Sequence, residues 1–571
     1  MIDAEKIIRE TYPELKISKD NKLLLKLVKK LIHEDDFNYV IETNKHLRGF
    51  AFLNKLLAYF NFSYQASPRS YNNIPAEGRL LVVANHPIGT LDGLALVKFI
   101  RSVRPDVRIV ANQILSHMQP LDSVFLPVDV LSKNAGHKKS YLAMLAALEN
   151  EEAVIVFPAG EVSRITPKGV RDGKWKSGFI KLAKKAKCPI LPVHIQASNS
   201  LLFYGMSTLY KPLGTAMLVK EMFNKNDQEL KFRVGSPIPY KAFIDEASNA
   251  KQLSQKFYQH VQNLAKKKKV SLFDTVETIA HPVNSKALKK ALYQSQLLGE
   301  TKDGKKIFLY DFKDDCPVMQ EIARLRELTF RTVEEGTGEA QDFDEYDIYY
   351  RHLVLWDVND LEIVGSYRLG EGSAIMKAKG IEGFYTNSLF KLNPEYKAHF
   401  NDSIELGRSF VQPRYWGQRS LDYLWYGIGA YLRANPEKKY LFGPVSMSNS
   451  YPDGAKQLII GFYKQQFSSD LNLAEARNPF VVTKKVQKLT EKSMSEDYKI
   501  SYKLLNADLK KLGVKVPTLY KQYAEVCNDQ GCHFIDFNVD ADFGDCIDSL
   551  IMIEIDKITD KKKQRYIKKS L

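Results

Sequence analysis

The segment NHPIGTLDG carries a histidine and an acid whose types and spacing suit proton transfer. His86 follows the apolar run RLLVVA, which predicts a buried strand, and Asp92 stands where a helix is expected to begin. A carboxylate beside one imidazole nitrogen fixes the tautomer and leaves the other nitrogen free to accept a proton from a substrate hydroxyl. Asp92 could equally cap the helix, so the pair alone leaves both interpretations open.

A second segment, FPAGEVSR, offers groups that could hold an anion. It follows another short apolar run and places Gly160, Glu161, Ser163 and Arg164 in an expected turn. A turn that combines glycine with an arginine suits a phosphate or a carboxylate. We expect these four residues, together with Asn85, to bind substrate.

Charged residues stand in apolar surroundings in the second half of the chain, which has no nucleophile motif, P-loop or metal signature. One interpretation is a set of exposed ion pairs, each worth about 0–1 kcal/mol. The alternative is a binding site formed by Arg326, Asp344, Asp347, Arg368, Glu405 and Arg408.

A turn before the helical segment SLDYLWYGIGAYLRAN contains Gly417, Arg419 and Ser420. Backbone amides at a helix N-terminus bind phosphate groups well. This turn is therefore a candidate binding loop for a pyrophosphate or a phosphopantetheine phosphate.

The elements that must position these residues alternate between short β-rich runs and helical stretches in both halves of the chain. Such alternation predicts α/β layers with a partly parallel sheet. We predict a helical region, a first α/β domain, a linker with a helix, a second α/β domain and a basic tail, over residues 1–75, 76–270, 271–305, 306–558 and 559–571.

The motifs of the first domain resemble the four blocks of the glycerolipid acyltransferase superfamily. These blocks are Asn85-His86 with Asp92, VFLPVD from Phe125 to Asp129, FPAGEVSR, and the strand from Pro189 to Val193. Five residues separate the histidine from the aspartate, and Ala159 replaces the usual acid of the third block. Both features resemble the hemolysin-like and aminolipid O-acyltransferases. The resemblance implies that His86 is the base, that Asp92 orients it, and that the acceptor is a lyso-aminolipid.

The second domain resembles the N-acetyltransferase-like fold, and more narrowly the ornithine N-acyltransferases and the autoinducer synthases. Their charged set falls on the six residues from Arg326 to Arg408 named above. The resemblance implies that Glu405 helps to deprotonate the amine and that Asp344 and Asp347 attract a cationic amino acid. An arginine common near Trp416 is missing, and Arg414 or Arg419 could replace it.

Both domains together resemble the bifunctional ornithine lipid synthases. The resemblance implies that the second domain transfers a 3-hydroxyacyl group from acyl carrier protein, or from coenzyme A, to the amine of an amino acid. The first domain then esterifies the hydroxyl of this lyso-lipid. No bound cofactor is expected. The alternative is a lysophospholipid O-acyltransferase with a single activity, whose second domain only binds acyl carrier protein.

The chain of 571 residues has 83 Lys and Arg against 67 Asp and Glu, a net charge of +16. This surplus suggests an anionic partner, such as acidic acyl carrier protein or an anionic membrane surface. A nucleic-acid binder is disfavoured because no recognition motif accompanies the charge. Five cysteines, an odd number, and the absence of an apolar signal segment favour a reducing, cytoplasmic protein.

Membrane attachment is expected to be peripheral, at the inner face of the cytoplasmic membrane, because no apolar run of about 18 residues occurs. The segment HLRGFAFLNKLLAYFNF could lie in the membrane interface through Phe50, Phe52 and Leu57, or pack as a core helix. Cys527, Cys532, His533 and Cys546 match no common zinc spacing, so we predict no metal site.

Overall fold

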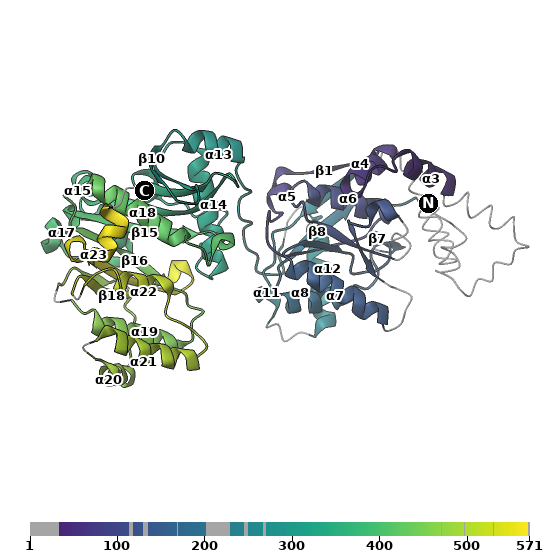
Figure 1. Cartoon of the computed structure of the whole chain (residues 1–571). Coiled ribbons are helices and arrows are strands. Elements are labelled where there is room, and N and C mark those ends of the chain that lie inside the picture. The colour runs from purple at the N-terminus through teal and green to yellow at the C-terminus, as the bar shows by residue number, and fades with distance from the viewer. Residues whose placement is uncertain are drawn as a thin grey trace, which may run out of the picture. The chain divides into compact units, whose positions relative to one another are not determined.

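The computed structural model describes residues 33–112, 118–128, 135–167, 169–200, 229–244, 249–266, 270–469, 471–495, 497–528 and 530–568. The chain forms two compact units, Met1–His281 and Pro282–Leu571 (Figure 1). Each unit is an α/β structure, so the predicted fold class is confirmed.

Unit 1 is built on a seven-stranded sheet in the order β1-β9-β8-β2-β5-β3-β4. All neighbouring strands are parallel except β8 and β9. Every residue of β2 is buried, as expected for a parallel strand covered on both faces. The strands are β1 Ser63–Ala66, β2 Leu80–Ala84, β3 Arg108–Asn112, β4 Phe125–Val128, β5 Ala153–Val156, β8 Ile190–Gln196 and β9 Glu229–Val234.

Helices cover both faces of this sheet (Figure 1). One face packs against α3 Glu34–Thr43, α4 Gly49–Tyr59 and α6 Thr90–Arg101. The opposite face packs against α7 Ala135–Glu149, α8 Gly178–Ala186 and α12 Ala250–Asn263. The remaining elements are α5 Pro68–Asn72, α11 Lys241–Ile244 and a hairpin of β6 Arg164–Thr166 with β7 Gly169–Arg171.

Helix α4 corrects the prediction of a membrane-interface helix. Phe52 and Leu56 have no exposed surface, and Leu57 is also buried, because these side chains pack into the core of unit 1. Phe50 is half-buried beneath the guanidinium of Arg101. The same apolar pattern on a helix face suits burial in lipid and burial in a protein core. In this structure the core of unit 1 covers the apolar face of α4. Within the described part of the chain, no helix is long and apolar enough to span a membrane.

Unit 2 contains an eight-stranded sheet in the order β10-β11-β12-β13-β15-β16-β19-β18. Neighbours are antiparallel except β15 and β16, which run parallel and pair only over Ser403–Glu405 and Tyr440–Phe442. The strands are β10 Gln296–Glu300, β11 Lys306–Asp311, β12 Arg351–Asp357, β13 Glu362–Glu371, β15 Ser403–Val411, β16 Tyr440–Met447, β18 Cys532–Asp540 and β19 Cys546–Glu554.

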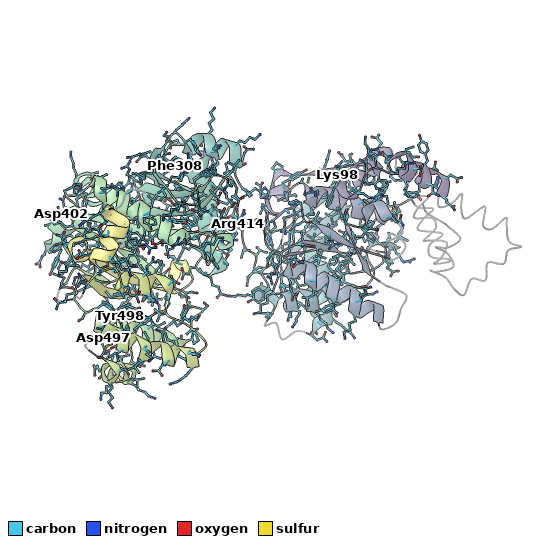
Figure 2. The ribbon with its side chains drawn as sticks, viewed as in Figure 1. Lys98, Phe308, Asp402, Arg414, Asp497 and Tyr498 are labelled. Atoms are coloured by element: carbon cyan, nitrogen blue, oxygen red, sulfur yellow. The ribbon has the colours of Figure 1, made fainter. Side chains whose placement is uncertain are left out.

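Two helical layers enclose this second sheet. One face carries α13 Ser285–Leu292, α14 Pro317–Thr332, α15 Gly372–Lys379, α16 Thr386–Leu389 and α17 Lys397–Asn401. The other carries α18 Ser420–Ala434, α19 Asp453–Gln466, α20 Lys484–Ser493, α21 Tyr498–Lys511 and α22 Thr518–Ala524. The short strands β14 Phe390–Leu392 and β17 Ala474–Ala476 form a separate ladder. In Figure 2, Phe308 marks β11 and Tyr498 marks the start of α21.

Two segments differ from their expected roles. The expected linker, residues 271–305, includes α13 and β10, which are integral to unit 2. The expected basic tail forms α23 Asp560–Lys562 and the helical segment Lys563–Lys568. Tyr566 is buried against α18, and its hydroxyl donates a hydrogen bond of 2.7 Å to Asp422. Most of the tail is therefore part of the domain, because one aromatic residue among the lysines anchors it.

Candidate active sites

His86 and Asp92 meet at the carboxyl end of β2 in unit 1. Nδ1 of His86 lies 2.8 Å from Oδ1 of Asp92. The other carboxylate oxygen, Oδ2, accepts the backbone N–H groups of Ile88 at 2.9 Å and Gly89 at 3.3 Å. Asp92 therefore does both things that the sequence allowed: it caps the turn into α6 and faces the imidazole.

The surroundings of His86 favour a proton-accepting imidazole. Burial opposes the charged ring, but the Asp92 carboxylate outweighs burial and raises the pKa of His86. The ring stacks on Phe157, with centroids 4.1 Å apart, and the side chain keeps 18% of its surface exposed. The orientation of the ring is thus fixed while a substrate can still reach it.

Asp172 links the FPAGEVSR loop to the histidine, and sequence reasoning missed it. Its Oδ1 accepts the backbone N–H of His86 at 3.2 Å and the hydroxyl of Ser163 at 2.5 Å, and its Oδ2 accepts the indole N–H of Trp175 at 2.9 Å. The backbone N–H of Ser163 also donates to the His86 carbonyl at 2.8 Å. Burial raises the pKa of Asp172 in spite of these donors. Only its position shortly after the loop, in RDGKW, could have indicated this role.

The other predicted residues of unit 1 divide into two groups. Asn85 is buried, and its side-chain amide makes two hydrogen bonds to the backbone of Ile195 on β8. Its NH₂ group donates to the carbonyl at 2.9 Å, and its oxygen accepts the N–H at 2.7 Å, so Asn85 positions the end of the strand. Glu161 and Arg164 lie at the surface, 3.3 Å apart. Gly160 has a φ of +68° and lies against the Lys176 ammonium, which adds a cation to the loop. The loop therefore carries two cationic side chains, Lys176 and Arg164, of which Arg164 is paired with Glu161.

In unit 2 the structure assembles the predicted charged residues into one buried network. Arg326 on α14 donates to both oxygens of Asp347, at 2.8 Å and 2.6 Å. Arg368 on β13 donates to Asp344 at 2.5 Å and to Asp347 at 3.1 Å. Burial would raise the pKa of Asp347, but the two guanidinium groups hold it well below its usual range. Arg326, Asp347 and Arg368 are therefore buried and do not form exposed ion pairs. Asp344 is partly exposed.

Asp342 is a further member of the network that sequence reasoning missed. Its Oδ2 lies 3.6 Å from both Arg326 and Arg408. Arg408, which is partly exposed, also lies 3.6 Å from Asp344, so three arginines face three aspartates. Asp347 is engaged by two arginines, whereas Asp344 is partly exposed and its Oδ2 accepts no hydrogen bond among the described residues, so of the two carboxylates Asp344 is the more accessible to a cationic amino acid.

Glu405 is enclosed by hydrogen-bond donors. The backbone N–H and the hydroxyl of Thr386 each donate to it at 2.6 Å, and the Tyr350 hydroxyl donates as well. The side chain is buried, which raises the pKa of Glu405 against the effect of these donors. The arrangement suits a residue that positions Tyr350 and α16 better than a base with a free lone pair. Neither Tyr350 nor Thr386 carried a signal in the sequence.

The predicted phosphate turn lies before α18. Gly417 has a φ of +75°, Arg419 precedes the first helical turn, and Ser420 is buried. Arg414 (Figure 2) is engaged by Asp360 at 2.9 Å and Glu362 at 2.7 Å. A cavity of about 490 Å³ beside α18 is lined by basic side chains, among them Lys302, Arg419, Lys561 and Arg565. Arg419, unlike Arg414, thus remains available to an anionic ligand.

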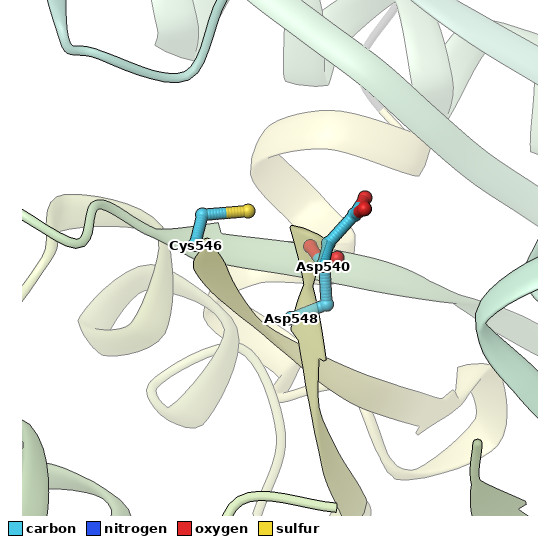
Figure 3. Close-up of side chains that lie close together, drawn as sticks. All are labelled: Asp540, Cys546 and Asp548. Atoms are coloured by element: carbon cyan, nitrogen blue, oxygen red, sulfur yellow. The ribbon is translucent and has the colours of Figure 1, made fainter. Parts of the chain in front are cut away.

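A set of potential metal ligands shares only Cys546 with the four residues that the sequence analysis considered. Among the described residues, Asp540, Cys546 and Asp548 bring one ligand atom each to within 4.8 Å of one another (Figure 3). Cys527, Cys532 and His533 do not belong to this group. The absence of a bound metal stays a prediction.

Comparison with known proteins accounts for both units. Residues 6–267 match the family model described as Acyltransferase, and residues 325–426 match the Acetyltransferase (GNAT) domain. The glycine N(alpha)-acyltransferase of Bacteroides thetaiotaomicron is 32% identical over 51% of this chain and 90% of its own length. The lyso-glycine lipid O-acyltransferase of the same organism is 30% identical over 43% of this chain and 90% of its own length. The chain belongs to the acyltransferases of aminoacyl-lipid synthesis.

This aminoacyl-lipid acyltransferase combines the two expected folds, a glycerolipid-type acyltransferase and a GNAT-like domain. The L-ornithine N(alpha)-acyltransferase of Brucella abortus is 31% identical over 23% of this chain and 50% of its own length. The relatives thus carry names for two different amino acids. The prediction of an acyltransferase is confirmed, and an amino acid and a lyso-lipid are the substrate classes that the relatives imply.

Proposed function

We propose that this acyltransferase carries out both acylations of an amino-acid lipid, first on the amine and then on a hydroxyl. The observation that supports this most strongly is that relatives named for each reaction match 51% and 43% of this one chain. The two units also contain separate clusters of buried polar residues, one around His86 and one around Arg368.

Unit 2 would transfer a 3-hydroxyacyl group directly from a thioester to the amine. No covalent enzyme intermediate is required, so the alignment of amine and thioester supplies most of the rate. The proposed donor is acyl carrier protein, an acidic partner suited to the basic cavity beside α18, with acyl-coenzyme A as the alternative.

Glycine is the first amino acid to test, and ornithine, which the sequence favoured, is the second. The relatives named for glycine are matched over 90% or more of their length, against about half for the first one named for ornithine. Asp347 agrees with this order, because Arg326 and Arg368 already engage its carboxylate and a cationic side chain would need an unpaired one.

Unit 1 would esterify the 3-hydroxyl of the resulting lyso-lipid. Nε2 of His86 takes the hydroxyl proton while Asp92 holds the ring and stabilises its charged form. Arg164 and Gly160 would hold an anionic part of the acceptor or donor, on a loop that Asp172 fastens beside the histidine. The net charge of +16 would support peripheral binding at an anionic inner membrane face.

Expression in a bacterial host without aminolipids, followed by lipid mass spectrometry, tests the proposal. Diacylated amino-acid lipid is expected, and its mass identifies the head group and the acyl chains. His86→Ala should accumulate the monoacylated lyso-lipid instead. Production of new lysophospholipid esters without any N-acyl amino acid would establish the single-activity alternative.

A further inference from the structure

Helices α20 and α21 concentrate basic charge at one end of unit 2 (Figure 1). Residues 481–515, which include both helices, contain nine lysines against four acids, and so carry +5 of the net charge of +16 of the whole chain. Among the described residues, only one of these lysines forms an ion pair, which joins Lys511 to Asp508 at 2.7 Å. The other lysines are therefore available to an anionic partner.

Large apolar side chains are exposed on the same two helices and beside them. Fifteen large apolar or aromatic residues are exposed in the described part of the chain, and five of them lie within residues 481–512. They are Val481, Leu489, Ile500, Leu504 and Leu512, with 41–74% of their surface exposed. Single exposed apolar residues are ordinary, but a group of them in so short a stretch indicates an interaction surface.

These exposed side chains are not what attaches the two helices to unit 2. The opposite faces of α20 and α21 already pack on α19 and on the core behind it. Thr490 of α20 is buried, and a methyl group on Gly461 of α19 would lie only 3.3 Å from it, so these two helices are in close contact. Leu505 and Leu509 of α21 are buried in the core. The core thus fixes the orientation of both helices and leaves their outer faces exposed.

On α21 the exposed apolar and basic side chains form adjacent stripes. Ile500 and Leu504 are one helical turn apart and lie on one stripe. Lys499, Lys503 and Lys510 are exposed and follow the neighbouring stripe, because they are spaced by one turn and then by two. An apolar stripe beside lysines suits an anionic bilayer, where apolar side chains enter the interface and ammonium groups meet lipid phosphates.

Helix α20 repeats this arrangement. Leu489 lies one turn from Lys485 and one turn from Lys492, and all three side chains are exposed. Long lysine side chains can keep their charge among the phosphates while their apolar stems follow the inserted leucine. An acidic carrier protein would also attract these lysines. Its proposed place, however, is the cavity beside α18, which other elements form, whereas a lipid product needs a membrane.

We propose that the exposed faces of α20 and α21 are the membrane-docking surface of this chain, and that its partner is an anionic phospholipid bilayer. The lysines bind the lipid phosphates, and Leu489, Ile500 and Leu504 enter the boundary between head groups and acyl chains. The proposal rests on the proposed peripheral binding, which the net charge supports without locating it. Vesicle binding requires no substrate, so the proposed acyl transfers are tested separately.

The test measures the partitioning of the full chain by sedimentation with vesicles. Vesicles of phosphatidylcholine alone are compared with vesicles of equal parts phosphatidylcholine and phosphatidylglycerol. The wild type should bind the anionic vesicles, and less so as salt is added, because charges are screened over about 8 Å at physiological ionic strength. Each lysine at an anionic surface favours binding about fivefold. Combined replacement Lys499→Gln, Lys503→Gln and Lys510→Gln should therefore lower the partition coefficient about 100-fold.

The apolar contribution is measured with Ile500→Ser combined with Leu504→Ser. Half of each side chain is exposed and can leave water on binding, so this variant should bind about tenfold or more weakly. Its deficit should persist at high salt, unlike that of the Gln variant. Since all the replaced residues are exposed, thermal unfolding should stay close to that of the wild type.

Two control variants separate charge at this surface from fold and from charge elsewhere. Arginine at the same three lysine positions keeps the charge and should bind like the wild type. Combined Lys377→Gln, Lys391→Gln and Lys397→Gln removes three exposed charges from the opposite helical layer of unit 2. It should also bind like the wild type.

Equal binding of the wild type and the Gln variant of α21 would overturn the assignment of this surface and leave the proposed peripheral binding in place. An equal loss in the variant of the opposite layer would overturn it too, because charge at any position would then suffice. Unchanged vesicle binding with lost affinity for acyl carrier protein would make the surface a carrier site instead. A wild type that does not sediment with anionic vesicles would refute the peripheral binding and this proposal together.

Discussion

Replacement of Asp92 by asparagine separates the two tasks of this residue. The asparagine oxygen can still accept the N–H groups of Ile88 and Gly89, so the turn into α6 should persist. Its NH₂ group would then face Nδ1 of His86, which in the wild type lies 2.8 Å from a carboxylate oxygen of Asp92. The imidazole must accept that hydrogen bond, so its proton moves to Nε2, the nitrogen that should receive the substrate proton.

The expected loss is about 10²–10⁴-fold in kcat for O-acylation of a supplied lyso-lipid, the range of a general base. The stability of unit 1 should change by less than about 1 kcal/mol, since Asn and Asp cap helices similarly. Asp92→Ala should be worse, because two buried N–H groups lose their acceptor at about 1–3 kcal/mol each.

The pH dependence provides a second readout of the same change. The rate falls as pH drops through the pKa of His86, because only the neutral ring accepts a proton. Asp92 raises this pKa and burial lowers it, so any activity left in Asp92→Asn should persist to lower pH than in the wild type. Radiolabelled acyl transfer and thermal unfolding measure both effects. An Asn variant with wild-type activity would refute the assignment of Asp92 as the orienting acid.

Three other predictions test separate parts of the structure. Arg326→Met leaves Asp347 buried without its bidentate partner and should cost about 3–5 kcal/mol in urea unfolding, whereas a loss below 1 kcal/mol would show that the pair does not stabilise unit 2. Phe52→Ala should destabilise unit 1 by about 3–5 kcal/mol and leave sedimentation of the folded protein with anionic vesicles unchanged; lost vesicle binding at full stability would restore the interface helix. Lys561→Glu beside the α18 cavity should lower kcat/KM for the carrier-protein donor about tenfold or more without changing KM for glycine, and an unchanged value would place the carrier elsewhere.

Local patterns predicted the parts of the site that lie close together in the sequence. His86 and Asp92 flank a single turn between a strand and a helix, so their contact follows from spacing and strand geometry. Asp172 was missed because it lies in a segment after the β6–β7 hairpin. No pattern of apolar and polar residues indicates that its carboxylate contacts Ser163.

Long-range contacts limited the predictions for unit 2. The network of Arg326, Asp347 and Arg368 joins a helix, a turn and a strand, and only the family resemblance suggested that they meet. Asp548 stands in the apolar strand CIDSLIMIE, where a lone acid carries no pattern of its own. The hydrogen bonds of Glu405 could not be predicted either, because they come from Thr386 and Tyr350 on other elements.

The most direct measurement incubates the purified chain with glycine, 3-hydroxyacyl carrier protein and a second acyl donor, and follows the products by mass spectrometry over time. N-acylglycine should appear first and decline as its O-acylated form accumulates, and His86→Ala should stop the sequence after the first product. O-acylation of supplied lyso-lipid without any N-acylation of glycine or ornithine would contradict the claim that one chain performs both reactions.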